Sequence, residues 1–192
     1  EPIDDIRVLT NRSSGKTAVA LSIDAFERGA DVELWYGYAQ EPVPSFVAVK
    51  RFETVHDLFV LLKSKDAKKF DGVIVCAAIA NYIPKKQTGK IPSGKQSFAI
   101  DCVQAPVVLE TLRSWIPHAK IVAFKTEEKK KNVTRRTQQL LTKFHLDAAI
   151  GNTLAGFGGD SNEILLLTKR GKSTWKKGKK EELASVILDL LR

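Results

Sequence analysis

The spacing of hydrophobic positions changes repeatedly along the chain, between the period of a helix and that of a strand. Residues 14–28 have helical spacing, and Gly29 follows them as a typical C-terminal stop. Residues 72–78 are continuously apolar, which is typical of a strand covered by helices on both faces. Shorter alternating or apolar runs predict further strands at 31–36, 46–52, 97–102, 120–124 and 148–151.

Helices are predicted between these strands. Thr54 and Asp57 form a variant of the capping box that opens one helix, and Pro106 suits the first position of another that ends at Trp115. The strongly basic stretch 127–144 is predicted to form a third helix. The chain closes with a hairpin, 164–168 and 173–175 around Gly171, and a helix over 180–191. This alternation predicts an α/β fold: a three-layer Rossmann-like sheet with helices on both faces, followed by a C-terminal β-hairpin and helix.

Composition places the chain among single-domain globular proteins. It has 192 residues, of which 43% are hydrophobic and 28% charged. No apolar run approaches the roughly 18 residues of a membrane span, and the acidic start differs from a secretory signal, so we expect no membrane partner and a cytoplasmic location. Cys76 and Cys102 sit in apolar surroundings and are predicted to be reduced core thiols. Because the sequence has no Met and begins at Glu1, we expect a domain of a longer polypeptide.

The net charge of +9 raises the hypothesis of nucleic-acid binding. The basic residues are spread over 63–69, 125–136 and 169–180, and no nucleic-acid-binding motif accompanies them. We therefore predict no nucleic-acid partner. A polyanionic small substrate, such as a nucleoside triphosphate, would explain part of the excess positive charge. Solvated surface residues would explain the rest.

A polar segment, 10–17, lies directly before the first predicted helix. Ser14 can act as its N-cap, and the free N–H groups of the first turn, with the helix dipole, favour an anion. Arg12 and Lys16 add mobile positive charge, so the segment is interpreted as the place that receives a phosphate or carboxylate. The alternative is a simple helix cap. A P-loop is set aside, because Thr10 stands where that motif needs glycine.

A long segment, 79–94, follows the buried strand and contains prolines and glycines that favour a loop. Loops of this length beside a buried strand are more often functional than idle. A second loop, 152–162, is rich in glycine and follows the strand at 148–151.

Several segments together resemble one family, phosphopantothenoylcysteine synthetase, which in many microbes is the C-terminal half of a bifunctional coenzyme A biosynthesis flavoprotein. The segments are 1–4, 10–16, 28–32, 77–82, 90–91, 124–127 and 156–162, and they occur in the family's order over nearly the whole chain. The segment from Asn11 to Lys16 is the most specific.

The resemblance implies a ligase. The carboxylate of 4′-phosphopantothenate attacks the α-phosphate of CTP, which gives an acyl-cytidylate and pyrophosphate, and the amine of cysteine then displaces CMP. Mg²⁺ is expected on the triphosphate, ATP is the alternative nucleotide, and a homodimer is implied. A non-catalytic nucleotide-binding or regulatory domain of the same fold is the alternative function.

The resemblance also assigns roles to residues of this sequence. Asn11 corresponds to an asparagine that holds the acyl-nucleotide, and Lys90 to a lysine on a mobile flap that neutralises phosphoryl charge. Ser13, Ser14, Gly15, Ala77 and Ala78 are expected to bind substrate. Phe124 either packs against the nucleotide or belongs to the core. The nucleotide is further expected to contact Asn81, Lys90, Pro106, Val107 and Lys143. No residue of the protein is assigned as a metal ligand.

Three departures from the family pattern bear on activity. Asn81 stands where the family has an aspartate, and Val107 stands where an aspartate follows the proline. The resemblance also implies an opening strand and a Gly-x-Thr turn immediately ahead of Glu1, with the strand central in the sheet. We therefore expect a single domain, 1–192, that lacks the family's first strand.

Overall fold

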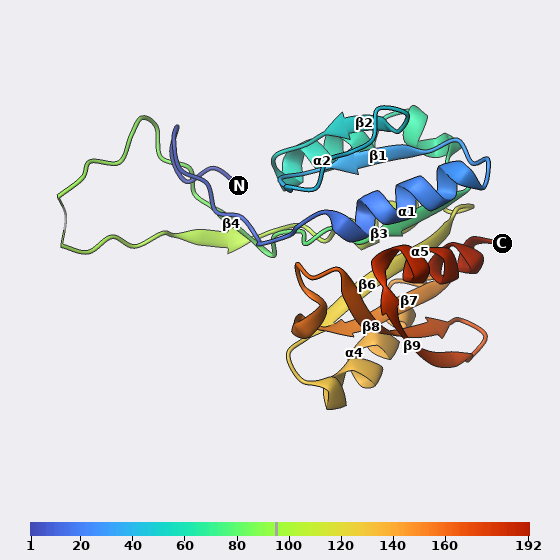
Figure 1. Ribbon diagram of the computed structural model, residues 1–192. Coiled ribbons are helices and arrows are strands. Elements are labelled where there is room, and N and C mark those ends of the chain that lie inside the picture. The colour runs from blue at the N-terminus through green and yellow to red at the C-terminus, as the bar shows by residue number, and fades with distance from the viewer. Residues whose placement is uncertain (95) are drawn as a thin grey trace.

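A five-stranded sheet forms the larger half of the protein in a computed structural model, which describes residues 1–94 and 96–192 (Figure 1). The strand order is β3-β6-β7-β8-β9. The first three strands are mutually parallel, and β8 and β9 run antiparallel as a C-terminal hairpin. Their bounds are β3 Gly72–Val75, β6 Lys120–Glu127, β7 Ala148–Thr153, β8 Ser161–Thr168 and β9 Ser173–Lys179.

Helices cover both faces of this sheet, because successive strand residues point to opposite sides. On β6, Ile121 and Ala123 face one helical layer and Val122 faces the other, and all three are buried. One layer holds α2 Val55–Leu62, α3 Val108–Trp115 and α4 Lys130–Lys143; the other holds α1 Lys16–Glu27 and α5 Lys180–Leu188. The predicted three-layer α/β fold with its terminal hairpin and helix is confirmed.

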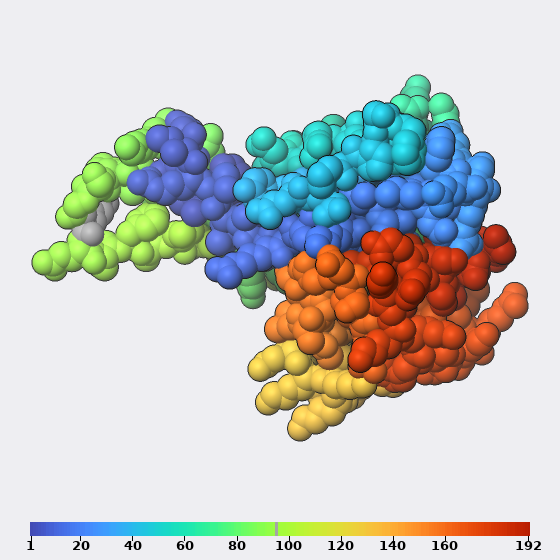
Figure 2. All heavy atoms as spheres, in the orientation of Figure 1, coloured from blue at the N-terminus to red at the C-terminus, as the bar shows by residue number. Residues whose placement is uncertain are grey.

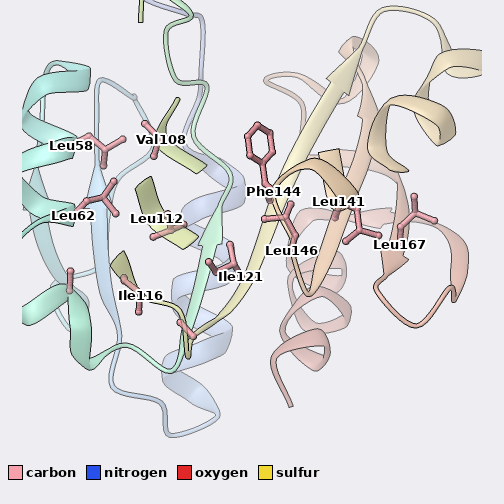
Figure 3. Packing of buried hydrophobic residues seen from close by; sticks show 14 of the residues in the cluster. Leu58, Leu62, Val108, Leu112, Ile116, Ile121, Leu141, Phe144, Leu146 and Leu167 are labelled. Carbon is pink, nitrogen blue, oxygen red and sulfur yellow. The ribbon is translucent and has the colours of Figure 1, made fainter. Parts of the chain in front are cut away.

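The layer of α2, α3 and α4 has its apolar side chains in two groups (Figure 3). Leu58, Leu62 and Leu112 come from α2 and α3, whereas Leu141 comes from α4. Ile121 of β6 lies between the two groups, and its side chain is fully buried. This layer therefore joins the part of the chain around α2 to the five-stranded sheet.

A separate two-stranded parallel sheet consists of β1 Glu33–Tyr36 and β2 Ala48–Arg51. Leu34 and Tyr36 pack with Val19 of α1, whereas Trp35 packs against the cluster that contains α2 and α3. The two helical layers thus continue from the larger sheet across to β1. Within the described residues, however, β1 pairs only with β2, and β3 pairs only with β6. The facing edges of β1 and β3 are therefore unpaired.

A cavity of about 1050 Å³ separates β1 from β3, and it is lined by both strands. This gap corrects the prediction that residues 72–78 form a fully covered strand. β3 ends at Val75, and its four residues are only half-buried. The reason is that helices cover the faces of β3 while one of its edges borders the cavity.

Residues 79–94 and 96–105 do not form the single long loop that was predicted for 79–94. They contain β4 Tyr82–Pro84 and β5 Cys102–Gln104, which pair antiparallel. With the N-terminal residues 1–9 alongside, this segment projects from the rest of the protein (Figures 1 and 2). The strand predicted at 97–102 is largely wrong, since pairing begins only at Cys102 and the described residues before it are exposed.

Helix ends differ in part from the predictions. The capping box is confirmed, because Asp57 N–H donates to Thr54 Oγ1 at 3.1 Å and Thr54 N–H donates to Asp57 Oδ2 at 2.9 Å. Ser14 is not the N-cap of α1; that position is Gly15, in a left-handed conformation with φ of 83°. Pro106 is not the first residue of α3, since Val107 precedes the helix in extended conformation and is its N-cap.

The two cysteines are free and half-buried. Cys76 packs at the edge of the cluster around α1 and α5, where burial raises the pKa of its thiol to about 11. Cys102 lies on β5, outside the three core clusters of the described residues, so the prediction of two core thiols is wrong for it.

Within residues 1–94 and 96–192, no helix is both long and apolar enough to cross a membrane.

Gly151 on β7 provides a test of the packing between α4 and the sheet. A Cβ atom there would lie 2.3 Å from Thr137 Oγ1 and 2.5 Å from Val133 Cγ1 of α4. We expect Gly151→Ala to lower the free energy of unfolding by about 1–3 kcal/mol, because the helix would have to shift. Chemical denaturation measures this change. Gly159→Ala is the control, since its Cβ would meet only Ser161 O at 3.8 Å, and equal stabilities would contradict the packing.

Candidate functional site

One end of the cavity is polar, and it lies where the parallel strands end. In open α/β sheets, ligands bind at the carboxyl ends of the strands. Here the ends of β3, β6 and β7 meet the segment that leads into α1. The residues that line this end are Asn11, Ser13, Ser14, Gly15, Ala77, Ala78, Phe124, Thr126 and Asn152. All seven of the predicted residues among them therefore line one end of the cavity: Asn11, Ser13, Ser14, Gly15, Ala77, Ala78 and Phe124.

Gly15 fixes the entry of the chain into α1. Its positive φ favours glycine, and a Cβ atom would lie only 2.0 Å from Tyr36 Oη at the end of β1. The Tyr36 hydroxyl in turn donates to Glu41 O at 2.8 Å. Close approach of Gly15 to Tyr36 thus brings the N-terminus of α1 to the carboxyl end of β1.

The first turn of α1 offers backbone donors to the cavity. No side chain caps this helix, and Ser14 Oγ reaches only Lys16 N–H, at 3.4 Å. Thr17 and Ala18 line the cavity. Unpaired N–H groups and the positive end of the helix dipole favour an anion at this position.

Asn11 connects this segment to β3. Its side-chain amide Nδ2 donates to Ala78 O at 2.8 Å. An asparagine amide has two N–H donors and an acceptor oxygen, so one donor and the oxygen remain for a ligand. Because the bond to Ala78 orients the amide at the mouth of the cavity, Asn11 is held in position before any ligand binds.

Asn152 and Thr126 are cavity residues that the sequence analysis missed. They are register partners on β7 and β6, and Thr126 Oγ1 donates to Asn152 Oδ1 at 2.8 Å. Asn152 is only 6% exposed, and its amide nitrogen has no partner in the described part of the protein. The signal in the sequence is a polar residue directly after the apolar run 148–151, at the point where a parallel strand ends.

Lys16 is not the mobile cation that the sequence predicted. It forms an ion pair with Asp160 of the glycine-rich loop, which raises the pKa of Lys16 and lowers that of Asp160. Lys180, the first residue of α5, also lines the cavity and is 5% exposed. Desolvation, and secondarily the charge of Lys16, lowers the pKa of Lys180. Lys16 and Lys180 therefore lie near this end of α1 together with Asp160, and Arg12 adds an exposed guanidinium.

Three residues expected to meet the nucleotide lie at the base of the projecting segment, outside the cavity lining. Asn81 is exposed, and its backbone oxygen accepts a hydrogen bond from Ala105 N–H at 2.9 Å. Pro106 and Val107 are also exposed, immediately before α3.

The two expected lysines lie elsewhere. Lys143, at the end of α4, has its ammonium 3.9 Å from Glu110 Oε1 of α3 and 4.9 Å from the centre of the Phe144 ring. Lys90 is exposed on the projecting segment and does not line the cavity. The chain by itself therefore does not bring Lys90 or Lys143 to Asn11.

Acidic residues do not form a metal site in the part of the chain that the structure describes, where no group of three or more His, Cys, Asp or Glu side chains could hold an ion. Mg²⁺ in nucleotide-dependent enzymes is commonly held by phosphate oxygens together with one or two carboxylates. The lining of the polar end supplies amides, hydroxyls and backbone groups instead. The residues at this end of the cavity do not fit a resident metal.

Fold and site together define an α/β domain with a small-molecule cavity at the carboxyl ends of its parallel strands. The chain belongs to the DNA/pantothenate metabolism flavoprotein C-terminal domain family, whose model matches residues 1–192.

The individual proteins to which this chain is similar support the family assignment. The chain is 31% identical over 194 residues to the coenzyme A biosynthesis bifunctional protein CoaBC of Thermococcus kodakarensis, covering 98% of this chain and 47% of that protein. It thus spans about half the length of such relatives. The crystal structure of the C-terminal domain of a CoaBC protein matches with a TM-score of 0.81 at 25% identity, covering 98% of this chain and 87% of the other. A Cab2 variant in complex with phosphopantothenate-cysteine matches in fold, with a TM-score of 0.77 at 18% identity over 99% and 81% of the two chains.

Gly15 provides the test of the site's geometry. We expect Gly15→Ala to lower the free energy of unfolding by at least about 2 kcal/mol, because left-handed backbone is costly for alanine and the methyl group would collide with Tyr36. Gly29→Ala is the matched control, since Gly29 has φ of 80° but open space around its Cβ position. Thermal and denaturant unfolding of both variants check this. A larger loss for Gly29→Ala would contradict the packing of Gly15 on Tyr36.

Proposed function

We propose that this domain is a phosphopantothenate–cysteine ligase of coenzyme A biosynthesis that uses CTP. The carboxylate oxygen of 4′-phosphopantothenate attacks the α-phosphorus of CTP, and the bond to the β-phosphate oxygen breaks, so that pyrophosphate leaves. The amine of cysteine then attacks the acyl carbon of the acyl-cytidylate. CMP departs, the ammonium loses a proton, and an amide remains.

The observation that carries this proposal is the polar end of the cavity, in a chain that belongs to this family. A reaction between two anions needs binding groups that hold them together and donors that offset their charge. The N-terminus of α1, the Asn11 amide and the Asn152 amide supply such donors around one space. Ala77 and Ala78 have small side chains beside it, which allows a ligand to approach the backbone of the segment after β3.

The state of Cys76 supports a reaction without an enzyme nucleophile. Cys76 lines the cavity, but burial raises the pKa of its thiol to about 11, so the thiol is protonated at neutral pH. A thiolate, not a thiol, is the effective nucleophile. Direct attack of the substrate carboxylate on the nucleotide requires no such group. The Cab2 structure that shares this fold is itself a complex with phosphopantothenate-cysteine, the product of the proposed reaction.

A non-catalytic nucleotide-binding domain is the alternative function. Asn81 and Val107 favour it, because each replaces a carboxylate that the family resemblance leads us to expect, and both lie outside the cavity lining. CTP and ATP are the two candidate nucleotides.

Pyrophosphate release tests the proposed function. With Mg²⁺, 4′-phosphopantothenate and CTP, we expect release that depends on phosphopantothenate and continues through many turnovers when cysteine is present. Parallel reactions with ATP identify the nucleotide. Nucleotide binding without pyrophosphate release, by a folded protein, would support the non-catalytic alternative and contradict the ligase.

Asn11→Asp tests the role that we propose for Asn11, whose amide donates to Ala78 O beside the cavity. The substitution sets a carboxylate against anionic substrates and replaces the donor to Ala78 O, so we expect kcat/KM to fall by at least about a hundredfold. Asn132→Asp on α4 is the control, because it makes the same chemical change outside the cavity lining. Asn11→Asp activity equal to that of Asn132→Asp would remove Asn11 from the mechanism.

We also propose that a further strand occupies the apolar part of the cavity and completes the sheet. Residues 1–192 do not supply this strand. Buried backbone groups are almost always paired, yet the facing edges of β1 and β3 are unpaired in the described residues. The carboxyl ends of both strands contact residues 11–15, through Tyr36 with Gly15 and Ala78 with Asn11. A strand between β1 and β3 can therefore run parallel to both.

The position of Glu1 suits a strand that arrives from this cavity. Glu1 lines the cavity, and its carboxylate accepts a hydrogen bond from Val55 N–H at 2.7 Å, at the start of α2. Because α2 follows the carboxyl end of β2, Glu1 lies at the edge where a parallel strand in the gap would end. An apolar segment joined ahead of Glu1 is thus the proposed occupant.

An N-terminal extension tests the proposed strand. We expect a strand of alternating valine and isoleucine, joined to Glu1 by a short glycine-containing turn, to raise Tm by several degrees and to reduce binding of a dye specific for exposed apolar surface. The control extension has the same length and two prolines, which cannot donate to a sheet. Equal Tm and equal dye binding for both extensions would contradict the proposed strand.

A further inference from the structure

Helices α1 and α5 lie side by side and run in the same direction, which brings their N-termini together (Figure 1). At their C-terminal ends, the guanidinium of Arg28 donates to Asp189 Oδ1 at 2.7 Å. At their N-terminal ends, Lys180 N–H donates to Asp160 O at 2.9 Å, and the carboxylate of Asp160 pairs with Lys16. The positive ends of two helix dipoles therefore lie at the same edge of the sheet.

Lys180 is a buried cation without an anionic partner. It is the first residue of α5 and is only 5% exposed, yet its ammonium forms no ion pair and donates no hydrogen bond in the part of the chain that the structure describes. The carboxylate of Asp160, whose backbone oxygen Lys180 contacts, is paired with Lys16 instead. Lysines are almost never buried without a partner, because removing an ammonium from water is costly. An anion from outside the chain would supply the missing partner.

The position of Lys180 is unfavourable for a positive charge in two further ways. A cation in the first turn of a helix opposes the helix dipole. Desolvation, followed by the charge of Lys16, lowers the pKa of Lys180, and the carboxylates of Asp160, Glu181 and Glu41 offset this only in part. A bound anion would offset both effects. Residues that weaken the fold in this way are typical of functional sites.

The carboxylates near Lys180 lie beside a different space from the cavity. Glu41, Asp160 and Glu181 line a separate pocket of about 170 Å³, which Lys180 also borders. None of these three carboxylates lines the larger cavity, whereas Lys180 does. Lys180 is thus the charged residue of this group that borders the same space as Asn152 and the first turn of α1.

A phosphate group matches the donors that meet in this part of the cavity. The first turn of α1 presents backbone N–H groups, and Asn152 has an amide nitrogen without a partner among the described residues. Lys180 adds an ammonium. A phosphate carries more acceptor oxygens and more negative charge than a carboxylate, so it satisfies more of these donors at once.

Resting on the proposed ligase function, we propose that Lys180 binds a phosphate group of a substrate at the N-terminus of α1. Its ammonium pairs with the phosphate oxygens as a fixed positive charge, forms no covalent bond and transfers no proton. Two substrates carry such a group. A nucleoside triphosphate would present its terminal phosphates, and 4′-phosphopantothenate would present its phosphate monoester.

Calorimetric titration with single ligands tests this role without turnover. Pyrophosphate, CTP and 4′-phosphopantothenate are titrated separately into the wild-type protein and into Lys180→Met, which keeps an unbranched apolar side chain but removes the charge. We expect Kd to rise by roughly tenfold or more for at least one of the three ligands. Lys176→Met on β9 is the matched control, since Lys176 is exposed and lines neither space, and its Kd values should equal those of the wild type.

The affected ligand identifies the phosphate group. Weaker binding of CTP and pyrophosphate places Lys180 at the terminal phosphates of the nucleotide, whereas weaker binding of 4′-phosphopantothenate alone places it at the phosphate monoester. Lys180→Arg retains the charge and should bind within about threefold of the wild type. Equal Kd values for Lys180→Met and the wild type would overturn the proposal. Equal losses in Lys180→Met and Lys180→Arg would do so too, as would a wild type that binds none of the three ligands.

Thermal unfolding separates a binding role from a structural one. Because the buried ammonium is unpaired and lies at a helix N-terminus, we expect Lys180→Met to raise Tm by a few degrees in the absence of ligand. A lower Tm together with unchanged ligand binding would show that the lysine serves the fold, and would overturn the proposal. A wild type that binds these ligands but releases no pyrophosphate would instead contradict the ligase function, while weaker binding by Lys180→Met would still support the role of Lys180.

Discussion

Pairing of backbone groups along the sheet is the constraint on which the rest of this structure depends. The two helical layers run without a break from the five-stranded sheet to β1 and β2, and Val19, Leu21 and Trp35 pack as if the sheet were continuous. The strands nevertheless stop pairing between β1 and β3. Unpaired strand edges within a layered fold recruit another strand because each buried N–H and C=O group needs a partner. The same gap provides the space in which the candidate site lies.

The apolar core and the polar residues of the candidate site adjoin each other at the carboxyl ends of the strands. Apolar residues line the length of the cavity, whereas amides, hydroxyls and helix N–H groups gather at one end. The polar groups are held by contacts within the scaffold, such as Asn11 with Ala78 and Thr126 with Asn152. Their positions are therefore set before a ligand binds, which lowers the entropic cost of ordering a reactive arrangement.

Sequence patterns identified most of the fold and part of the site. Thr54 with Asp57, Gly29, and the apolar runs of β6 and β7 are local signals. The structure agrees with them because local hydrogen bonding and side-chain burial determine such features. Asn11, Ser13, Ser14, Gly15, Ala77 and Ala78 line one cavity in the structure, at the edge that the carboxyl ends of the parallel strands share. The contact of residues 1–9 with the segment after β4 was missed, since it depends on Asp4, which is far in sequence from Ile91. The pairing of Lys16 with Asp160 and the depth of Lys180 were missed for the same reason.

The protonated thiol of Cys76 has a consequence for the redox chemistry of the cavity. Exchange between a thiol and a disulfide proceeds through the thiolate, and a pKa of about 11 leaves very little thiolate at neutral pH. Exchange of Cys76 with a disulfide-containing small molecule is therefore slow. The cavity wall thus contains a thiol that favours the reduced, unlinked state while a sulfur-containing molecule passes beside it.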